Sequence, residues 1–333
     1  MYPVGVFGLF NIRKPAGPTS HDVLDIVRRR LPHGTKAGHA GTLDPFAEGV
    51  LVICAGPAVR LASYVQQQPK TYLAEVVLGA TSTTDDPTGQ ITPASGILAQ
   101  GPRRSTTQPG GAPQSDVSCR GPATPPDERE VRSVLKEFEG EILQVPPVFS
   151  AVHLDGKRAY KLARAGKCPS LTARAVTVHA INTVQYDYPR LELEVTCGAG
   201  TYIRALARDI GRRLGTGGYC AKLIRTRVGP FRIDDSVWPD ELDPLRHLLP
   251  PLLALGHLAR IELDPHACRA LAMGRHVSLP VCLDTLRLPV GPDSAQPGRE
   301  VELAVVNREG ELVAIAKLLP PGGTIRATRV FAR

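Results

Sequence analysis

The stretch GHAGTLDP at residues 38–45, followed by GVLVI at 49–53, is the most informative part of this sequence. Pro45 biases the preceding residue, Asp44, toward an extended backbone. The glycines in and after the stretch allow the backbone or a ligand to approach closely. The apolar run from Gly49 predicts a buried strand. One carboxylate is therefore expected in a rigid loop beside a buried strand, although an ordinary aspartate turn would have the same spacing.

The residues before this stretch predict a strand and then a helix. Residues 4–12 are apolar and predict a buried strand, and prolines at 15 and 18 indicate a turn. Ser20 is the predicted N-cap of a helix that ends before Pro32. The last turn of this helix carries three arginines, which either complement the helix dipole or form a solvated basic face.

The residues after the stretch include two predicted strands and an insertion. Residues 72–79 predict a strand in which every second residue from Tyr72 to Leu78 lies on one face. Residues 191–197 alternate between apolar and polar side chains, as a half-exposed strand does. Residues 100–126 contain ten Gly or Pro among 27 positions and no Leu, Ile, Phe, Tyr or Trp. Such a segment buries too little apolar surface to offset its ordering entropy. We interpret it as a flexible insertion that ends at Asp127, the predicted N-cap of a helix.

The composition indicates a globular protein with one large and one small domain. The chain has 333 residues, 42% hydrophobic and 22% charged, with a net charge of +8. After Pro250 the sequence predicts a β-rich module with a short helix opened by Asp264 and a hairpin around Gly310. No apolar run reaches the roughly 18 residues of a membrane-spanning helix. Seven cysteines without a C-x-x-C pair predict a reducing, cytoplasmic location.

Two basic clusters favour a polyanionic partner. In a helix predicted from Thr201, Arg204, Arg208 and Arg212 share one face, where like charges repel unless an anion lies across them. The second cluster surrounds Tyr160 and consists of Lys157, Arg158, Lys161, Arg164 and Lys167. Basic residues with an interleaved aromatic suit a nucleic-acid backbone and stacked bases. A solvated basic face is the open alternative, and a membrane surface is the weaker one.

Other motifs indicate no familiar enzyme chemistry. The sequence contains no Walker loop, H-E-x-x-H or G-x-S-x-G. Gly198-Ala199-Gly200 follows a predicted strand, but Ile203 occupies the third glycine position of a dinucleotide loop. The stretch DDPTG at residues 85–89 lacks the spacing of a metal loop and is interpreted as a plain turn.

Five ordered motifs resemble the TruB family of bacterial tRNA pseudouridine synthases, over residues 8–235. Besides the stretch at 38–51, they are KPAGPTS at 14–20, KTY at 70–72, SAVHLDGKRAY at 150–160 and GTYIR at 200–204. The sequence departs from the family pattern at Ala40, where many members have threonine. The insertion at 100–126 and a longer C-terminal module are further departures.

The resemblance implies an α+β fold with two domains. Residues 1–255 are expected to form a pseudouridine synthase catalytic domain, a mixed, mainly antiparallel β-sheet flanked by helices that carries the 100–126 insertion. Residues 256–333 are expected to form a PUA-like RNA-binding β-barrel. The implied activity converts uridine 55 in the T-loop of tRNA to pseudouridine without a cofactor or metal. The implied partner is the T arm of tRNA, with no membrane, no obligatory protein partner and a monomeric state.

The resemblance also assigns expected roles to residues at the motif positions. Asp44 matches the catalytic nucleophile, Tyr72 the residue that stacks on the extruded base, and Arg204 the partner of the aspartate. Our hypothesis is that Arg204 keeps Asp44 ionised in a dry pocket. Tyr72 is also a candidate base for the C5 proton, although a phenol with a pKa near 10 is a poor one. RNA contacts are expected from His39, Tyr202, Leu223, Lys14, Lys157, Arg158, Lys161 and Arg208.

Three alternative functions remain open at this point. A synthase that depends on a guide RNA shares the Asp44 motif, but such enzymes usually carry lysine-rich tails that this chain lacks. A tRNA chaperone could bind and refold tRNA through the same basic residues. A carboxylate glycosidase would need a second acid beside Asp44, and only Glu48 is near in sequence.

Overall fold

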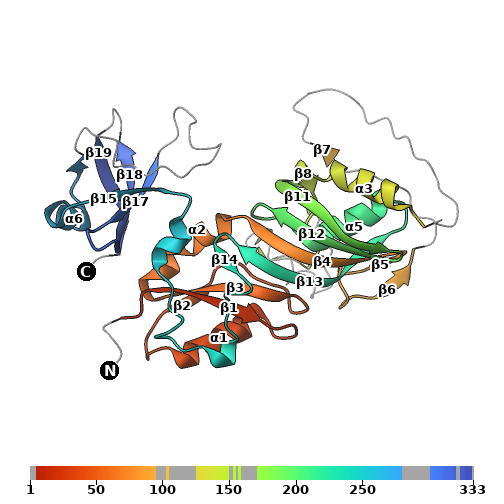
Figure 1. Cartoon of the computed structure of the whole chain (residues 1–333), viewed down its shortest axis with the longest axis horizontal. Helices are drawn as coiled ribbons and strands as arrows, with labels where there is room; N and C mark the ends of the chain where they lie inside the picture. Colours follow the sequence, from red (N-terminus) through yellow and green to blue (C-terminus); the bar gives the residue numbers. More distant parts are fainter. Residues whose placement is uncertain are drawn as a thin grey trace.

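The computed structural model describes residues 5–94, 103–104, 125–149, 153–154, 157–158, 171–279, 301–319 and 323–331. A ten-stranded sheet runs through the larger part of the molecule (Figure 1). Its order is β1-β3-β13-β4-β12-β11-β8-β7, with β2 paired to β3 and β14 to β13. Only the β13–β3 pair is parallel among these described strands. The expectation of a mixed, mainly antiparallel α+β fold is confirmed.

The elements of the larger part have the following bounds. The sheet strands are β1 Gly8–Lys14, β2 Ala37–His39, β3 Glu48–Ala55, β4 Lys70–Leu78, β7 Arg103–Arg104, β8 Gly140–Gln144, β11 Arg174–Asp187, β12 Arg190–Cys197, β13 Gly218–Val228 and β14 Phe231–Arg232. Two short pairs stand apart: β5 Ala80–Ser82 with β6 Ile91–Pro93, and β9 His153–Leu154 with β10 Lys157–Arg158. The helices are α1 Ser20–Arg30, α2 Ala62–Gln67, α3 Glu128–Glu137 and α5 Ile203–Arg213, with 3-10 turns η1 Gly56–Leu61, η2 Pro239–Glu241 and η3 Pro251–Leu255.

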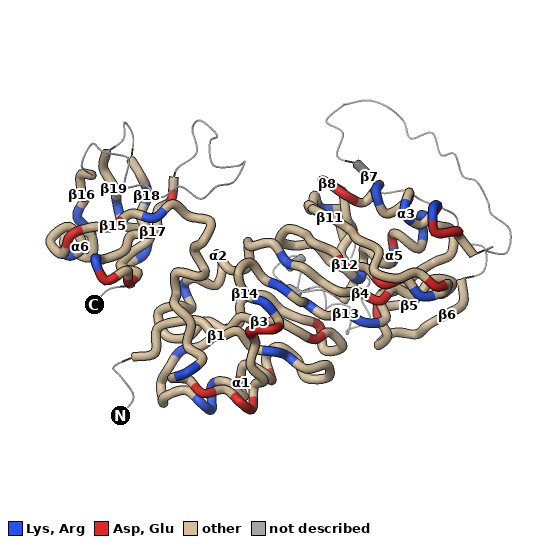
Figure 2. Tube along the Cα trace, in the orientation of Figure 1, with Lys and Arg blue, Asp and Glu red and all other residues tan. Residues whose placement is uncertain are grey.

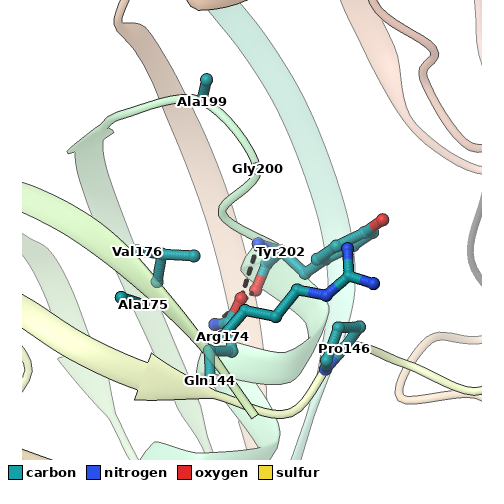
Figure 3. Close-up of a pocket in the computed structure, with 8 residues that line it drawn as sticks. All are labelled: Gln144, Pro146, Arg174, Ala175, Val176, Ala199, Gly200 and Tyr202. Carbon is teal, nitrogen blue, oxygen red and sulfur yellow. Dashed lines mark hydrogen bonds between the residues drawn. The ribbon is translucent and has the colours of Figure 1, made fainter. Parts of the chain in front are cut away.

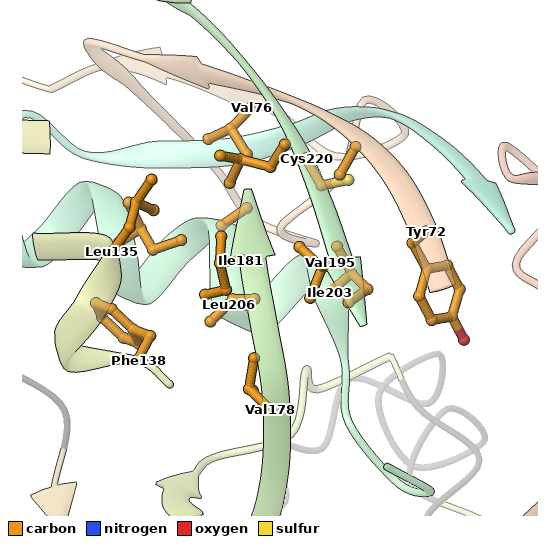
Figure 4. Packing of buried hydrophobic residues seen from close by; sticks show 14 of the residues in the cluster. Tyr72, Val76, Leu135, Phe138, Val178, Ile181, Val195, Ile203, Leu206 and Cys220 are labelled. Carbon is orange, nitrogen blue, oxygen red and sulfur yellow. The ribbon is translucent and has the colours of Figure 1, made fainter. Parts of the chain in front are cut away.

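Helices α3 and α5 pack against the sheet around β4, β12 and β13. The apolar stripe predicted for α5 is buried, and Ile203, Leu206 and Ile210 join a cluster with Val76 and Val195 (Figure 4). The predicted alternation in β4 and β12 is confirmed, because their apolar positions face this cluster. This packing fixes the start of α5 against the strands that carry the site residues.

Helix α1 covers the other end of the sheet, where Phe10 and Ile12 of β1 pack with Val23 and Val27. The predicted N-cap was one residue off. Thr19 caps the helix through a capping box with Asp22, since each binds the other's backbone N–H. Ser20 is therefore free to make a different contact, described below.

The C-terminal module is a curled five-stranded sheet with one helix. Its elements are β15 Ala259–Glu262, α6 Pro265–Ala272, β16 Val277–Ser278, β17 Glu302–Val306, β18 Leu312–Leu319 and β19 Thr324–Val330. The predicted helix cap at Asp264 and the β17–β18 hairpin are confirmed. The module contacts the larger part through the stacked rings of Phe7 and Phe331, whose centroids are 5.5 Å apart.

Some expectations concern residues outside the described ranges. Except at β7 and at residues 125–126, the insertion of 100–126 lies outside them, and so does most of the basic cluster around Tyr160. The four cysteines in the described ranges are free thiols. In that part of the chain, no helix is long and apolar enough to cross a membrane.

Candidate active site

The Asp44 loop, between β2 and β3, is held in place by the segment that leads into α1 and by the first residue of that helix. Ser20 Oγ accepts a hydrogen bond from Leu43 N–H at 2.8 Å and donates one to the Leu43 carbonyl at 3.0 Å. The Gly17 N–H donates to the Pro45 carbonyl at 2.7 Å. The KPAGPTS motif therefore acts as a clamp on the backbone that carries Asp44.

Lys14 belongs to this clamp, a position that differs from the RNA contact predicted for it. The side chain is fully buried, and Nζ donates to the carbonyls of Pro15, Pro45 and Ala47 at 2.9, 3.2 and 2.7 Å. Burial lowers the pKa of Lys14 to about 8, with the nearby Asp44 carboxylate opposing the shift. All three donors of the ammonium are directed to the loop and its neighbour, so none reaches an external anion.

Arg225 of β13 holds the opposite side of the loop, and the sequence analysis did not single it out. Its guanidinium donates to the Val50 carbonyl at 2.7 Å and to the Gly41 carbonyl at 3.0 Å. Gly49 has a φ of +107°, and a Cβ there would lie 2.3 Å from the Arg225 carbonyl oxygen. The third glycine of the opening stretch is thus required by a close backbone approach as well as by its conformation.

The structure brings Asp44 and Arg204 together. Arg204 Nη2 donates to Asp44 Oδ1 at 3.2 Å, and Arg204 Nε lies 2.9 Å from Oδ2, as an ion pair without the alignment of a hydrogen bond. The arginine side chain is 3% exposed and the aspartate side chain 35%. The carboxylate is therefore accessible to a substrate, while the cation behind it is not.

A second carboxylate, on Asp86, binds the same guanidinium. Arg204 Nη1 donates to Asp86 Oδ2 at 2.8 Å and to the Thr84 carbonyl at 3.0 Å. Asp86 is buried, and its other oxygen accepts the Thr88 N–H at 2.9 Å. Residues 85–89 form the predicted turn, and this turn also supplies a buried anion, which the sequence did not indicate. The neighbouring Asp85, with a φ of 60°, marks an unusual backbone at this position.

The pKa of Asp44 lies above its ordinary value. Burial is the largest cause, and the Asp86 carboxylate adds to it. The Arg204 cation acts in the opposite direction, and Lys14 does so more weakly. Arg204 therefore limits the rise of the pKa, as our hypothesis required in sign, but it does not cancel the effect of burial.

The basic row on α5 faces acids of the protein itself. Arg208 is 13% exposed and donates to Asp85 at 2.8 Å, to Asp209 at 2.9 Å and to the Val145 carbonyl at 2.9 Å. Most of its donors are therefore used within the protein, and the RNA contact of Arg208 stays a prediction. Arg212, 50% exposed, lies 3.8 Å from Asp209. Figure 2 shows acidic positions interspersed among the basic ones over the larger part of the molecule.

Tyr72 lies on β4 next to this site. Figure 4 shows its ring at one end of the apolar cluster, with the hydroxyl directed away from the other labelled residues. The residue is 7% exposed, and burial raises the pKa of its hydroxyl, so that less of it is present at neutral pH as the phenolate, the form that could accept a proton. In the same cluster, Leu223 of β13 is 5% exposed and pairs with Ala74 of β4.

The remaining predicted residues are distributed around the site. His39 is half-buried on β2, opposite Ile53 of β3. Tyr202 precedes α5, and its backbone N–H and carbonyl both bind the Gln144 side chain, at 2.8 and 3.1 Å. Lys157 and Arg158 form β10, for which only the backbone is described, and Lys161 lies outside the described residues.

Comparison with known proteins identifies one family along most of the chain. The TruB family pseudouridylate synthase N-terminal domain matches residues 28–108 and 104–203. The tRNA pseudouridylate synthase B C-terminal domain matches residues 204–249.

Curated relatives are similar over nearly their whole length. Proteins named tRNA pseudouridine synthase B share 35% identity in Gloeothece citriformis, covering 94% of this chain and 91% of the relative, and 35% in Dehalococcoides mccartyi, covering 98% and 97%. The protein of that name from Moorella thermoacetica is 36% identical, covering 95% of both chains.

Solved structures with a similar fold include two multicomponent assemblies. A Cbf5-Nop10-Gar1 complex matches with a TM-score of 0.66 and 26% identity, covering 98% of this chain and 84% of that one. An H/ACA RNP bound to a substrate RNA matches with a TM-score of 0.65 and 25% identity, covering 98% and 86%. On the combined evidence of motifs, fold and relatives, this chain belongs to the TruB family of pseudouridine synthases, which are isomerases.

Proposed function

We propose that this protein converts a uridine in the T-loop of tRNA, at position 55, to pseudouridine. The Asp44–Arg204 contact carries the proposal, because it supplies one accessible carboxylate backed by a buried cation. The relatives named tRNA pseudouridine synthase B support tRNA as the substrate. The T-loop position follows from the motif resemblance.

The reaction is an isomerisation with no net redox change. The bond from ribose C1′ to uracil N1 breaks, the base turns, and a bond from C1′ to C5 forms. The C5 proton leaves, and N1 gains one. Because atoms and electrons balance within the substrate, the reaction needs no electron carrier. The protein has to supply a nucleophile and the groups that transfer protons.

Asp44 is the proposed nucleophile, and it can act only as the anion. Its carboxylate attacks either ribose C1′ or the uracil ring, and both routes use the same side chain. The backbone clamps from Ser20 and Lys14 hold the loop that carries it. A nucleophile held in this way loses little entropy on approaching its target atom.

The target base must leave its stack before Asp44 can reach it. The Tyr72 ring, at the end of the apolar cluster, offers a face for the extruded base. Stacking on an aromatic ring contributes roughly 1–3 kcal/mol per base, which offsets part of the unstacking cost. His39, Tyr202 and Leu223 are proposed to contact the RNA around the extruded base.

The raised pKa of the Tyr72 hydroxyl argues against Tyr72 as the base that removes the C5 proton. Its proposed role is therefore to stack on the extruded base.

The C-terminal residues 256–333 are proposed as a separate RNA-binding, PUA-like domain, with residues 1–255 as the catalytic domain. Lys157, Arg158 and Lys161 are proposed to contact the phosphate backbone.

Pseudouridine mapping in a T-arm transcript tests this function. The purified protein should form one pseudouridine, at position 55, and Asp44→Ala should form none. Melting curves of both proteins serve as the control for folding. Pseudouridine at another position, or formation that persists in Asp44→Ala, would contradict the proposal.

The similarity to Cbf5 complexes favours one alternative, a synthase that works with a guide RNA and partner proteins. The relatives named tRNA pseudouridine synthase B favour activity without a guide. The same transcript assay distinguishes the two, because it contains neither guide nor partner. A protein inactive alone, but activated by a guide assembly, would replace the first proposal.

A further inference from the structure

Two consecutive aspartates bind two arginines that lie one helical turn apart on α5. Arg204 Nη1 donates to Asp86 Oδ2, and Arg208 Nη1 donates to Asp85 Oδ2, both at 2.8 Å. Residues four apart share one face of a helix. The aspartate turn, residues 84–88, is therefore joined to α5 at two points. The proposed reaction uses the first pair, whereas no step of it involves the second.

The Asp85–Arg208 pair is shielded from solvent, since both side chains are 13% exposed. The Arg208 guanidinium also donates to both carboxylate oxygens of Asp209, at 2.9 and 3.1 Å. Asp85 has a φ of 60°, in the left-handed region that aspartate and asparagine tolerate better than most other residues. Breaking such a shielded pair has a larger effect than breaking a surface pair, so this pair is able to hold two segments together.

The same two arginines bind the segment that follows β8. Arg208 Nη2 donates to the Val145 carbonyl and Arg204 Nη2 to the Phe149 carbonyl, both at 2.9 Å. Arg204 Nη1 also donates to the Thr84 carbonyl at 3.0 Å. Both arginines are therefore bonded to the same two parts of the chain, the aspartate turn and the segment after β8.

This segment starts from a fixed point at the end of β8. The side-chain amide of Gln144 accepts the Tyr202 N–H at 2.8 Å and donates to the Tyr202 carbonyl at 3.1 Å (Figure 3). Pro146 follows closely and restricts the backbone of Val145. The Val145 carbonyl that Arg208 binds is thus presented by a constrained backbone.

The position of the Arg204 guanidinium determines the charge balance at Asp44. The charged groups that face Asp44 are Arg204, Asp86 and Lys14. The interaction of two charges weakens as their distance grows, so a shift of the guanidinium changes how strongly it stabilises the carboxylate. Apart from Asp44, the described partners of Arg204 all lie in the two parts of the chain that Arg208 also binds.

We propose that Asp85 and Arg208 form a positioning pair, which holds the aspartate turn and the segment after β8 so that Arg204 faces Asp44 in the geometry needed for attack. This inference rests on the proposed function, because it takes Asp44 as the nucleophile. The described contacts of the Arg208 side chain do not include Asp44, so the pair acts through Arg204. Loss of a positioning pair lowers the rate of the bound substrate, whereas loss of an RNA contact weakens binding.

Two single variants and their combination test the pair. Asp85→Asn removes the charge and keeps a residue that tolerates the positive φ, and Arg208→Gln removes the cation. The matched control is Glu137→Gln, because Glu137 of α3 accepts two hydrogen bonds from Arg213 at the far end of α5, at 2.8 and 2.9 Å. Melting curves verify folding. Single-turnover pseudouridine formation with saturating protein measures the rate, and T-arm hairpin binding measures the affinity.

Asp85→Asn and Arg208→Gln should each lower the rate by roughly tenfold or more and leave the affinity within about twofold. The double variant should be at most about twofold slower than the slower single variant, because the two residues act as one unit. Glu137→Gln should stay within about twofold in both measurements. An unchanged rate in either single variant, or a loss confined to affinity, would overturn the inference.

Titration of the Asp44 carboxyl in the free protein separates positioning from the effect of a distant charge. NMR of isotope-labelled aspartate follows it, with Asp44→Asn for assignment. Acting only through space, removal of the Asp85 anion would lower the Asp44 pKa, and removal of the Arg208 cation would raise it. Displacement of Arg204 raises the pKa in both variants and moves the acid limb of the rate to higher pH. Shifts of opposite sign would overturn the inference.

The titration needs no RNA, so the two proposals can fail separately. If the Asp44 pKa rises in both variants but the wild-type protein forms no pseudouridine at position 55, the positioning pair stands and the proposed function fails. If pseudouridine forms at position 55 and neither rate nor titration changes in the variants, only the positioning pair fails.

Discussion

Two buried arginines contact the region of Asp44 from opposite sides, and they are neutralised differently. Arg204, on α5, is bound by the carboxylates of Asp44 and Asp86. Arg225, on β13, donates to the carbonyls of Gly41, Thr42 and Val50, and among the described residues no carboxylate lies within ion-pair distance of it.

This difference gives the two arginines different roles: Arg204 affects the pKa of Asp44, whereas Arg225 holds the shape of the loop. Carbonyl acceptors satisfy the donors of Arg225 but leave its full charge, which acts on neighbouring groups and adds to the lowering of the Lys14 pKa by burial. The carboxylates around Arg204 instead compensate its charge, so that its position determines how far the Asp44 pKa rises. We expect changes at Arg204 to alter the chemistry and changes at Arg225 to alter the stability of the loop.

The largest effect is expected from a substitution of Asp44 itself. Asp44→Asn keeps the shape of the side chain and removes the charge needed for attack, so the turnover rate should fall by roughly 10⁴-fold or more. Single-turnover pseudouridine formation measures the rate. A rate within about tenfold of wild type, from a protein with an unchanged melting temperature, would contradict the assignment.

The next effect concerns the pH dependence of Arg204→Lys. An ammonium cannot contact both carboxylates as the guanidinium does, so the Asp44 pKa should rise further. Asp44 is active as the anion, and activity is therefore lost as the pH falls through this pKa. The acid limb of the kcat/KM profile should move to higher pH, and Arg225→Lys serves as the matched control. An equal shift in both variants would show that the two arginines do not differ in this respect.

Methionine substitutions compare the contributions of the two arginines to the free energy of unfolding. Arg204→Met leaves Asp86 as a buried unpaired carboxylate and should lower the free energy of unfolding by about 3–5 kcal/mol. Arg225→Met leaves buried carbonyls without donors and should lower it by about 2–4 kcal/mol. Urea unfolding measures both values. For Arg225→Met, we further expect the rate per folded molecule to stay within about tenfold of wild type, and a larger loss would assign Arg225 to the chemistry.

The smallest effect is expected far from both arginines. Arg190 is 74% exposed, and its Nε lies 3.9 Å from Glu75 Oε1, a distance typical of a weak surface pair. Arg190→Ala should change the free energy of unfolding by less than about 0.5 kcal/mol and leave the rate unchanged. A measurable loss of activity would indicate an RNA contact on that side of the sheet.

The family, the fold class and the loop of Asp44 could be predicted from the sequence because their signals are local. Helix periodicity, strand alternation and caps depend on neighbours a few residues away, and the order of the motifs is written along the chain. The same local reasoning failed for the basic row on α5. It counted Arg208 as a free cation, whereas Asp85, 123 residues earlier, binds it in the fold.

Nothing in the sequence indicated that Lys14 and Asp86 are buried. A lysine and an aspartate are usually exposed. The expectations were an RNA contact for Lys14, from the family resemblance, and an ordinary turn for residues 85–89. Both are buried here, and each is satisfied by groups from distant parts of the chain.

The sequence by itself determined that Asp44 would stand in a glycine-bounded loop before a buried strand, since neighbouring residues dictate the backbone there. Only the tertiary structure decided which charges surround it. Asp44, Asp86 and Arg204 come from three separate segments, and they meet because the sheet and α5 bring those segments together. The interaction of charges depends on their distance and burial, and neither quantity exists until the chain has folded.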